Sequence, residues 1–396
     1  MKWIDKTNEF EKYYESISDC FVLDQGLYFF GAGKIGNEVY SILNRICLIN
    51  GFIDNNRSII GTTVNGKRVF ALGEVKNCKP FIVVTVASER YDEIRNQLFK
   101  EGYYEGKNFV YWETLIKKML PVALNYQKGM NYVGLTQISL TERCTLSCVN
   151  CAHACNYVSI QSDDLPLEMV KESADAFFSI CDYVHTFVLI GGEPLLYKNL
   201  AEVIEYIGKK YRNRIYRFQI STNGTILPSD DIKEKSKRYD VFYLISNYSV
   251  QIPKLKEQYR KLTETLNESG IEFALFPEET EWTDYGFQTV ERDDDPQKLI
   301  SVFDACHTEC HEIRGKKFYY CVMARSVNEN MNLGVGLDDY LDLDTLDPRS
   351  ISDKRIFMEY SLGYSEKGYL EMCRFCNGAE REDHPIPAAV QGKRMG

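Results

Sequence analysis

Apolar runs alternate with amphipathic stretches along most of the chain and divide it into three segments. In the first, residues 1–125, the apolar run LYFF leads into a glycine turn and a helical pattern. The apolar run PFIVVTVAS (80–88) is followed in the same way by the amphipathic stretch RYDEIRNQLFKEG. Strands that alternate with helices predict a small parallel sheet covered by helices.

The second segment, residues 126–300, repeats the alternation with longer helical patterns such as LEMVKESADAFFSIC. Strands are expected at 134–140, 185–190, 215–221, 240–246 and 271–276. Repeated strand–helix units predict a barrel or part of one, with active residues at the C-terminal strand ends. The third segment, residues 301–396, has weak periodicity and five cysteines, and we expect a metal cluster to order it.

Composition narrows the class of protein. With 44% hydrophobic and 26% charged residues in 396, the chain is typical of soluble globular proteins. A formal net charge of −10 without a long basic block argues against a nucleic-acid partner. The sequence contains no apolar run of about 18 residues, so we expect no membrane span. The charged start MKWIDKTNEFEKYY does not resemble a signal peptide. A cytoplasmic protein is therefore expected.

The 13 cysteines are clustered, with four between 144 and 155 and five between 306 and 376. Without a secretion signal, this clustering favours metal ligation in a reducing compartment over a disulfide framework.

Cys144, Cys148 and Cys151 form a CxxxCxxC motif just after an expected strand. Three thiolates on a short loop can hold three irons of a 4Fe–4S cluster and leave the fourth iron open to an exchangeable ligand. Four alternatives remain. These are a chance occurrence of the spacing, a zinc site completed by His153 or Cys155, an electron-transfer cluster with Cys155 as fourth ligand, and ordinary buried thiols.

A second motif, Gly191-Gly192-Glu193-Pro194, ends an apolar strand about 40 residues further on. Glycines there let backbone carbonyls approach a ligand closely, and a glutamate can accept a hydrogen bond from an ammonium group. The alternative for this motif alone is a tight strand-to-helix turn.

Together, the two motifs resemble the radical S-adenosylmethionine superfamily over residues 134–276. The resemblance implies a partial (β/α)6 TIM-type barrel, a 4Fe–4S cluster, and a GGEP motif that binds the methionine amino group. It also places Ser221, Asn223 and Ser246 where methionine or ribose is contacted, with strand-end capping as the alternative. Asn150 departs from the pattern, because an aromatic residue near the adenine is usual there.

The later cysteines resemble the auxiliary-cluster region called SPASM or twitch. They are Cys306, Cys310, Cys321, Cys373 and Cys376. Because no cysteine follows the final CxxC, the match is to the single-cluster twitch type, with an auxiliary 4Fe–4S cluster. One cluster needs four ligands, so one cysteine is spare, and Cys306 and Cys310 are the ambiguous pair. A structural zinc site is the alternative.

The first segment contains GAGKIG at 31–36, a GxGxxG pattern, and Asp54 follows 18 residues after its last glycine. This context predicts a Rossmann-like domain that binds a dinucleotide or another nucleotide, or one without a working cofactor. GAGKIG followed by GFIDNN also resembles domains attached to bacterial surface-sugar and sugar-modifying enzymes.

The resemblance implies reductive cleavage of S-adenosylmethionine to a 5′-deoxyadenosyl radical, with electrons from a flavodoxin- or ferredoxin-type donor. We expect this radical to abstract hydrogen from a carbohydrate or nucleotide-sugar carbon, leading to epimerisation or dehydrogenation. Epimerisation needs a hydrogen donor, for which a free thiol such as Cys155 or Cys181 is a candidate. Trp282, Asp284 and Tyr285 are expected at the barrel mouth, with an exposed loop as the alternative. Peptide modification and a non-catalytic Fe–S or zinc scaffold remain open.

Overall fold

The computed structural model describes residues 9–292, 295–306, 310–335, 339–364, 367–378 and 383–396. The chain forms two compact units, residues 7–132 and residues 133–396, and each is described by itself. The predicted division of the second unit at residue 300 stays a prediction. None of the helices in the described part of the chain has the length and apolarity needed to cross a membrane.

The first unit is built on a six-stranded sheet of order β3-β4-β2-β1-β5-β6. Its strands are β1 (Leu27–Phe30), β2 (Ile49–Ile53), β3 (Thr63–Val64), β4 (Lys67–Phe70), β5 (Phe81–Val84) and β6 (Phe109–Tyr111). All neighbouring pairs are parallel except β3 with β4. The predicted parallel sheet is therefore confirmed. Its helices are α1 (Glu9–Ser18), α2 (Lys34–Leu43), α3 (Leu72–Val75), α4 (Ser88–Lys100), α5 (Trp112–Thr114) and α6 (Leu120–Lys128).

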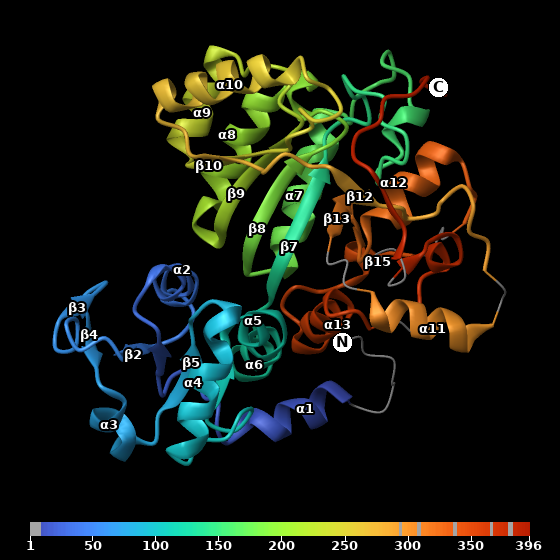
Figure 1. Ribbon diagram of the computed structural model, residues 1–396. Helices are drawn as coiled ribbons and strands as arrows, with labels where there is room; N and C mark the ends of the chain where they lie inside the picture. The colour runs from blue at the N-terminus through green and yellow to red at the C-terminus, as the bar shows by residue number, and fades with distance from the viewer. Residues whose placement is uncertain (1–8, 293–294, 307–309, 336–338, 365–366, 379–382) are drawn as a thin grey trace. The chain divides into compact units, whose positions relative to one another are not determined.

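The second unit contains an eight-stranded sheet of order β11-β10-β9-β8-β7-β13-β14-β15. Its first five strands, at the predicted positions, are β7 (Tyr132–Ser139), β8 (Tyr183–Ile190), β9 (Ile215–Thr222), β10 (Val241–Ile245) and β11 (Phe273–Leu275). The helices between them are α7 (Leu167–Ile180), α8 (Leu200–Tyr211), α9 (Asp230–Arg238) and α10 (Leu255–Ser269). Figure 1 shows α8, α9 and α10 gathered along one side of β8–β10. The expected mixed α/β fold of a partial barrel is confirmed.

The sixth parallel strand comes from the cysteine-rich segment. β13 (His311–Arg314) pairs in parallel with β7, and β14 (Lys317–Tyr319) returns antiparallel to it in a hairpin around Gly315. β15 (Leu341–Asp342) completes the sheet. The remaining elements are β12 (Glu281–Thr283), β16 (Pro385–Pro387), α11 (Pro296–Ala305), α12 (Val322–Met331) and α13 (Ile351–Ser361).

An aromatic cluster joins the hairpin to helix α7 of the barrel. Phe177 of α7 packs on Phe318 of β14 and Phe357 of α13, with ring centroids 6.0 and 6.1 Å apart. All three side chains are fully buried. Because a buried phenylalanine stabilises a fold by about 1.5–3 kcal/mol, this contact fixes the cysteine-rich segment against the barrel.

Candidate functional site

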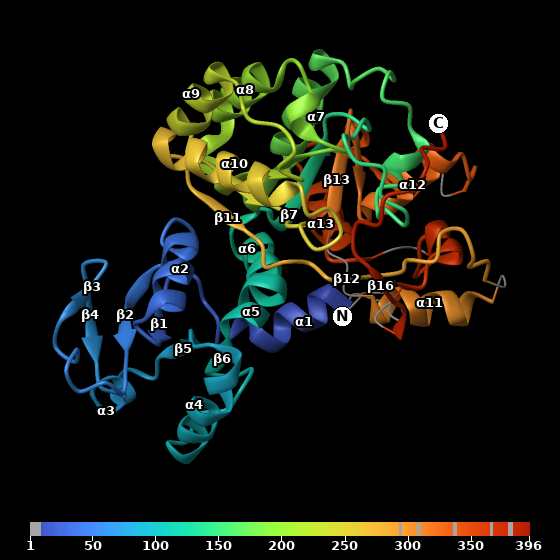
Figure 2. The same ribbon diagram turned by 45° about the horizontal axis from the view of Figure 1, so that its top comes forward.

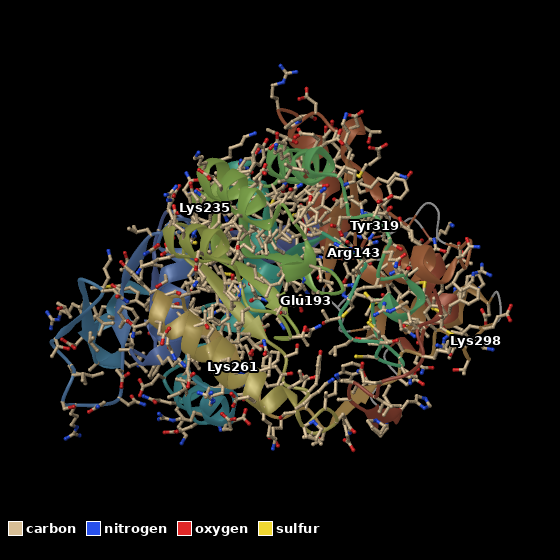
Figure 3. The ribbon with its side chains drawn as sticks, turned by 90° about the horizontal axis from the view of Figure 1, so that it is seen from above. Arg143, Glu193, Lys235, Lys261, Lys298 and Tyr319 are labelled. Carbon is tan, nitrogen blue, oxygen red and sulfur yellow. The ribbon has the colours of Figure 1, made fainter. Side chains whose placement is uncertain are left out.

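A cavity of about 340 Å³ lies where the chain leaves the carboxyl ends of β7, β8, β9 and β10. This is the end of a parallel sheet where active residues were expected. Figure 3 shows two residues of the neighbouring loops, Arg143 and Glu193. The cavity is lined by Cys144, Asn150, Cys151, Ala152, His153, Cys155, Ile190, Gly191, Gly192, Ser221, Thr222, Asn223, Ser246, Tyr248, Trp282, Thr283 and Tyr285.

The sulfur atoms of the CxxxCxxC loop accept hydrogen bonds from the surrounding chain. The Leu146 amide and Asn223 Nδ2 each lie 3.4 Å from Cys144 Sγ, and Gln391 Nε2 lies 3.2 Å from Cys148 Sγ. Burial raises the pKa of the Cys144 and Cys148 thiols to about 12. Both thiols therefore keep their protons until a metal displaces them. The neighbouring N–H groups would then donate hydrogen bonds to the thiolates.

Cys151 is partly buried beside the buried Cys155, and the interaction with Cys155 is the main cause that lowers the pKa of Cys151. Within the described ranges, no three His, Cys, Asp or Glu side chains converge on a single metal ion. In a cubane cluster each thiolate binds a different iron, so three thiolates on one loop are a donor set that such a cluster can take.

Gly191 and Gly192 form the seat of the cysteine loop. The Gly192 amide donates to Thr141 O at 2.8 Å, and the Glu193 amide donates to Arg143 O at 2.9 Å. A Cβ on Gly192 would lie 2.6 Å from the Arg143 carbonyl carbon and 2.8 Å from Cys144 Cβ. Only glycine permits this approach, so the motif positions the loop that carries the cysteines.

Glu193 is fully buried, and its carboxylate is already held by protein donors. It accepts from the Leu195 amide at 3.0 Å, the Asn223 amide at 2.9 Å, and Thr222 Oγ1 at 2.8 and 2.9 Å. Burial raises its pKa to about 7, although these donors act in the opposite direction. The side chain thereby fastens the end of β8 to the end of β9. Pro194 begins the short 3₁₀ helix that follows.

The three polar residues expected at a bound methionine or ribose all line the cavity. Ser221 Oγ accepts from Gln219 at 2.9 Å. Burial raises the pKa of Tyr248, and a hydrogen bond with Ser246 acts in the opposite direction. Asn223 has a further role, because its amide also donates to Thr145 Oγ1 at 3.2 Å in the cysteine loop.

The segment expected at the barrel mouth is not an exposed loop. Its residues 281–283 form β12, which pairs antiparallel with β16. Trp282 and Tyr285 line the cavity, and Trp282 packs edge-on against Tyr248 with ring centroids 5.5 Å apart. Asp284 is not among the lining residues, and its Oδ1 accepts from the Gly286 amide at 2.8 Å.

Four of the five later cysteines line a second, apolar cavity. They are Cys306, Cys321, Cys373 and Cys376. Cys310 is not among the described residues that line it. Burial is the main cause that raises the pKa of Cys321, and nearby Cys376 and Cys306 raise it further. Four cysteines along one cavity match the ligand number of one auxiliary cluster, and the choice between Cys306 and Cys310 as a ligand stays a prediction.

Two supports of the cysteine loop gave no signal in the sequence. Buried Arg325 on α12 donates to Glu142 at 2.7 Å and to Glu312 at 2.8 Å, which ties the residue before Arg143 to β13. The segment Ala388–Met395 also lies along the loop. Both supports act over a long separation in sequence, so periodicity and motif spacing do not reveal them.

In the first unit, the glycine pattern forms a tight turn between β1 and α2. Gly31 has φ +124°, and a Cβ there would lie in contact with Thr85 O. The Asp54 carboxylate accepts from the Ala32 amide at 2.9 Å and from the Asn56 amide at 2.8 Å. The acidic side chain is thus engaged by the glycine turn, and nucleotide binding in this unit stays a prediction.

Comparison with known families identifies two regions of the chain. Residues 138–272 match the radical SAM superfamily, and residues 25–109 match the C2185-like N-terminal domain. Among curated proteins, GTP 3′,8-cyclase of Rhizobium etli (strain CIAT 652) is 32% identical over 95 residues, which cover 24% of this chain and 27% of that enzyme. The subtilosin biosynthesis protein AlbA of Bacillus subtilis (strain 168) is 29% identical over 97 residues, which cover 24% of this chain and 19% of AlbA.

The matched region spans 27% of the cyclase and 19% of AlbA. Among solved structures, BtrN in complex with AdoMet and 2-DOIA has a TM-score of 0.41 at 15% identity, covering 65% of this chain and 100% of BtrN. SuiB of Streptococcus suis bound to S-adenosylmethionine has a TM-score of 0.29 at 16% identity, and the match covers 55% of this chain and 48% of SuiB. Likeness at this level says nothing about a substrate.

Proposed function

Because this chain carries a radical SAM superfamily domain at residues 138–272, as its two motifs predicted, we propose that Cys144, Cys148 and Cys151 hold a 4Fe–4S cluster that binds S-adenosylmethionine. When bound, such a cluster supplies one electron that cleaves S-adenosylmethionine to methionine and a 5′-deoxyadenosyl radical. The protein's own residues bind the cofactor, orient the substrate and exclude water.

One observation carries this proposal: the cysteine loop is seated on Gly191 and Gly192 at the wall of the cavity. The same two glycines line that cavity, so their backbone lies beside the space that a cofactor would occupy. Ser221 and Ser246 are available at neighbouring strand ends. Glu193 contributes indirectly in this proposal, because its carboxylate holds the backbone of the next strand end.

For the substrate, we propose a hydroxylated carbohydrate or cyclitol carbon. The cavity presents aromatic faces from Trp282, Tyr248 and Tyr285 beside serine, threonine and asparagine side chains. Aromatic faces suit the C–H surface of a ring, and short polar side chains suit its hydroxyl groups. Among the described lining residues none is a lysine or arginine, which favours an uncharged ring over a nucleotide sugar, the other substrate predicted.

Two outcomes follow hydrogen abstraction. Epimerisation needs a hydrogen atom delivered to the opposite face, and Cys155 is the candidate donor because it lines the cavity. Cys181 is a weaker candidate, since it is buried at the end of α7 with its thiol donating to Tyr183 O. Dehydrogenation instead removes one more electron and a proton, and the cysteines at 306, 321, 373 and 376 would hold the acceptor. Deuterium incorporation at one product carbon in heavy water distinguishes the outcomes.

The test is S-adenosylmethionine cleavage by the anaerobically reconstituted chain with a strong reductant. We expect 5′-deoxyadenosine and methionine from the native chain, and none from the variants Cys144→Ala, Cys148→Ala or Cys151→Ala. A native chain that binds iron but forms no 5′-deoxyadenosine contradicts the proposal. Turnover of a peptide and of no sugar or cyclitol would replace the substrate class with peptide modification. A flavodoxin- or ferredoxin-type donor should replace the chemical reductant.

A further inference from the structure

The segment Ala388–Met395 runs antiparallel to the first part of the cysteine loop. The Val149 amide donates to Val390 O at 2.7 Å, and the Gly392 amide donates to Ser147 O at 2.8 Å. Cys148 and Gln391 face each other across this bridge. Figures 1 and 2 both show the red end of the chain beside the green loop that follows β7.

Gln391 holds the middle of the loop with both atoms of its amide. Its Oε1 accepts from the Ser147 amide at 2.9 Å, while its Nε2 donates to Cys148 Sγ at 3.2 Å. Nε2 also donates to Ala389 O at 2.8 Å, which fixes the orientation of the amide. The side chain therefore presents an N–H donor to one of the three sulfurs proposed to bind iron.

Arg394 holds both ends of the loop with one guanidinium group. Nη2 donates to Cys144 O at 2.7 Å and to Leu146 O at 3.0 Å. Nη1 donates to Cys155 O at 3.1 Å and to Val158 O at 2.8 Å. A planar guanidinium with several donors suits four converging carbonyls, and a lysine ammonium cannot reproduce that fork.

The loop needs such support because two of its residues have an unfavourable backbone conformation. Asn150 and Ala154 have φ of +60° and +53°, in the left-handed region that costs a residue with a Cβ free energy. Residues persist in such conformations only where the surrounding structure holds them. The contacts from Gln391 and Arg394 supply this restraint from outside the loop.

We propose that residues 388–395 are a clasp that holds the cysteine loop in its cluster-binding shape, with Arg394 and Gln391 as positioning residues. Arg394 fixes the path of the loop, and Gln391 partly neutralises the charge on the Cys148 sulfur. The part that concerns the cluster rests on the proposed function. The part that concerns the loop does not, since every contact is made by the protein alone.

The loop is tested first in the full-length chain without iron, by hydrogen exchange of peptides covering residues 144–158. Arg394→Ala should raise their exchange rate about tenfold, the factor for losing about one net hydrogen bond. Arg394→Lys should restore it only in part. Lys393→Ala is the matched control, because this exposed neighbour makes no hydrogen bond among the described contacts. Equal exchange in Arg394→Ala and Lys393→Ala overturns the clasp, whether or not the chain binds iron.

The cluster is tested next, in the reconstituted chain. Arg394→Ala should release iron to a chelator several-fold faster than Lys393→Ala does. Gln391→Glu keeps an acceptor for Ser147 but places a charged oxygen where the amide donates to Cys148, so it should lower the reduction potential of the cluster. Unchanged iron release and an unchanged potential overturn the positioning role. Native protein that binds no iron refutes the proposed function but leaves the exchange result standing.

Discussion

Gly192→Ala tests whether the glycine motif seats the cysteine loop. The added Cβ would lie 2.6 Å from the Arg143 carbonyl carbon and 2.8 Å from Cys144 Cβ, both well inside van der Waals contact. The nearest atoms belong to backbone, which cannot rotate away. The loop must therefore either accept the overlap or move off the seat.

Both responses have a similar cost. Overpacking costs about 1–3 kcal/mol. Moving the loop instead breaks the amide bonds from Gly192 to Thr141 and from Glu193 to Arg143, each worth about 1 kcal/mol net. We therefore expect a loss of about 2 kcal/mol in the stability of the second unit, which lowers its melting temperature by roughly 4–8 °C.

The assay is thermal unfolding of the cluster-free chain, followed by iron content after reconstitution. Gly134→Ala is the matched control, because a Cβ on Gly134 meets no atom within 4 Å. We expect Gly192→Ala to melt lower and to retain less iron, and Gly134→Ala to behave as the native chain. If Gly192→Ala melts and binds iron like Gly134→Ala, the glycines do not seat the loop.

Three further predictions concern the two cysteine groups and one histidine. Cys144→Ala should abolish S-adenosylmethionine cleavage, whereas Cys155→Ala should retain it and lose only deuterium incorporation if the reaction is an epimerisation. Cys321→Ala should lower the iron content from about eight to about four atoms per chain, and Cys310→Ala should leave it at about eight, as measured by colorimetric assay. Burial lowers the pKa of His185 to about 4, so the unfolded chain binds its proton more readily as the pH falls below 6.5. Stability of the cluster-free chain should fall between pH 6.5 and 4, and His185→Phe should flatten that part of the denaturation profile.

Much of the second unit could be predicted because its strands are regular. Strands β7–β11 lie within a few residues of the expected ranges, since each is a buried apolar run between polar turns. The cysteine spacing and GGEP were visible for the same reason, since each motif is local.

Contacts between distant segments could not be predicted in this way. β13 has the sequence HEIR, which carries no apolar alternation, so nothing marked it as a partner of β7. The buried Glu193 carboxylate is likewise held from the next strand, where Thr222 Oγ1 and the Asn223 amide donate to it. The support from Arg394 depends on residues about 240 positions away, a separation at which sequence patterns carry no information.

The central claim is a three-cysteine cluster with one iron open to S-adenosylmethionine. The most direct measurement is the electron paramagnetic resonance spectrum of the reduced Cys321→Ala variant, in which the signal of the first cluster stands alone. We predict a 4Fe–4S signal that changes when S-adenosylmethionine is added and that disappears when Cys148→Ala is introduced. A signal that S-adenosylmethionine does not change, or a reconstituted chain that holds zinc and no iron, would contradict the account.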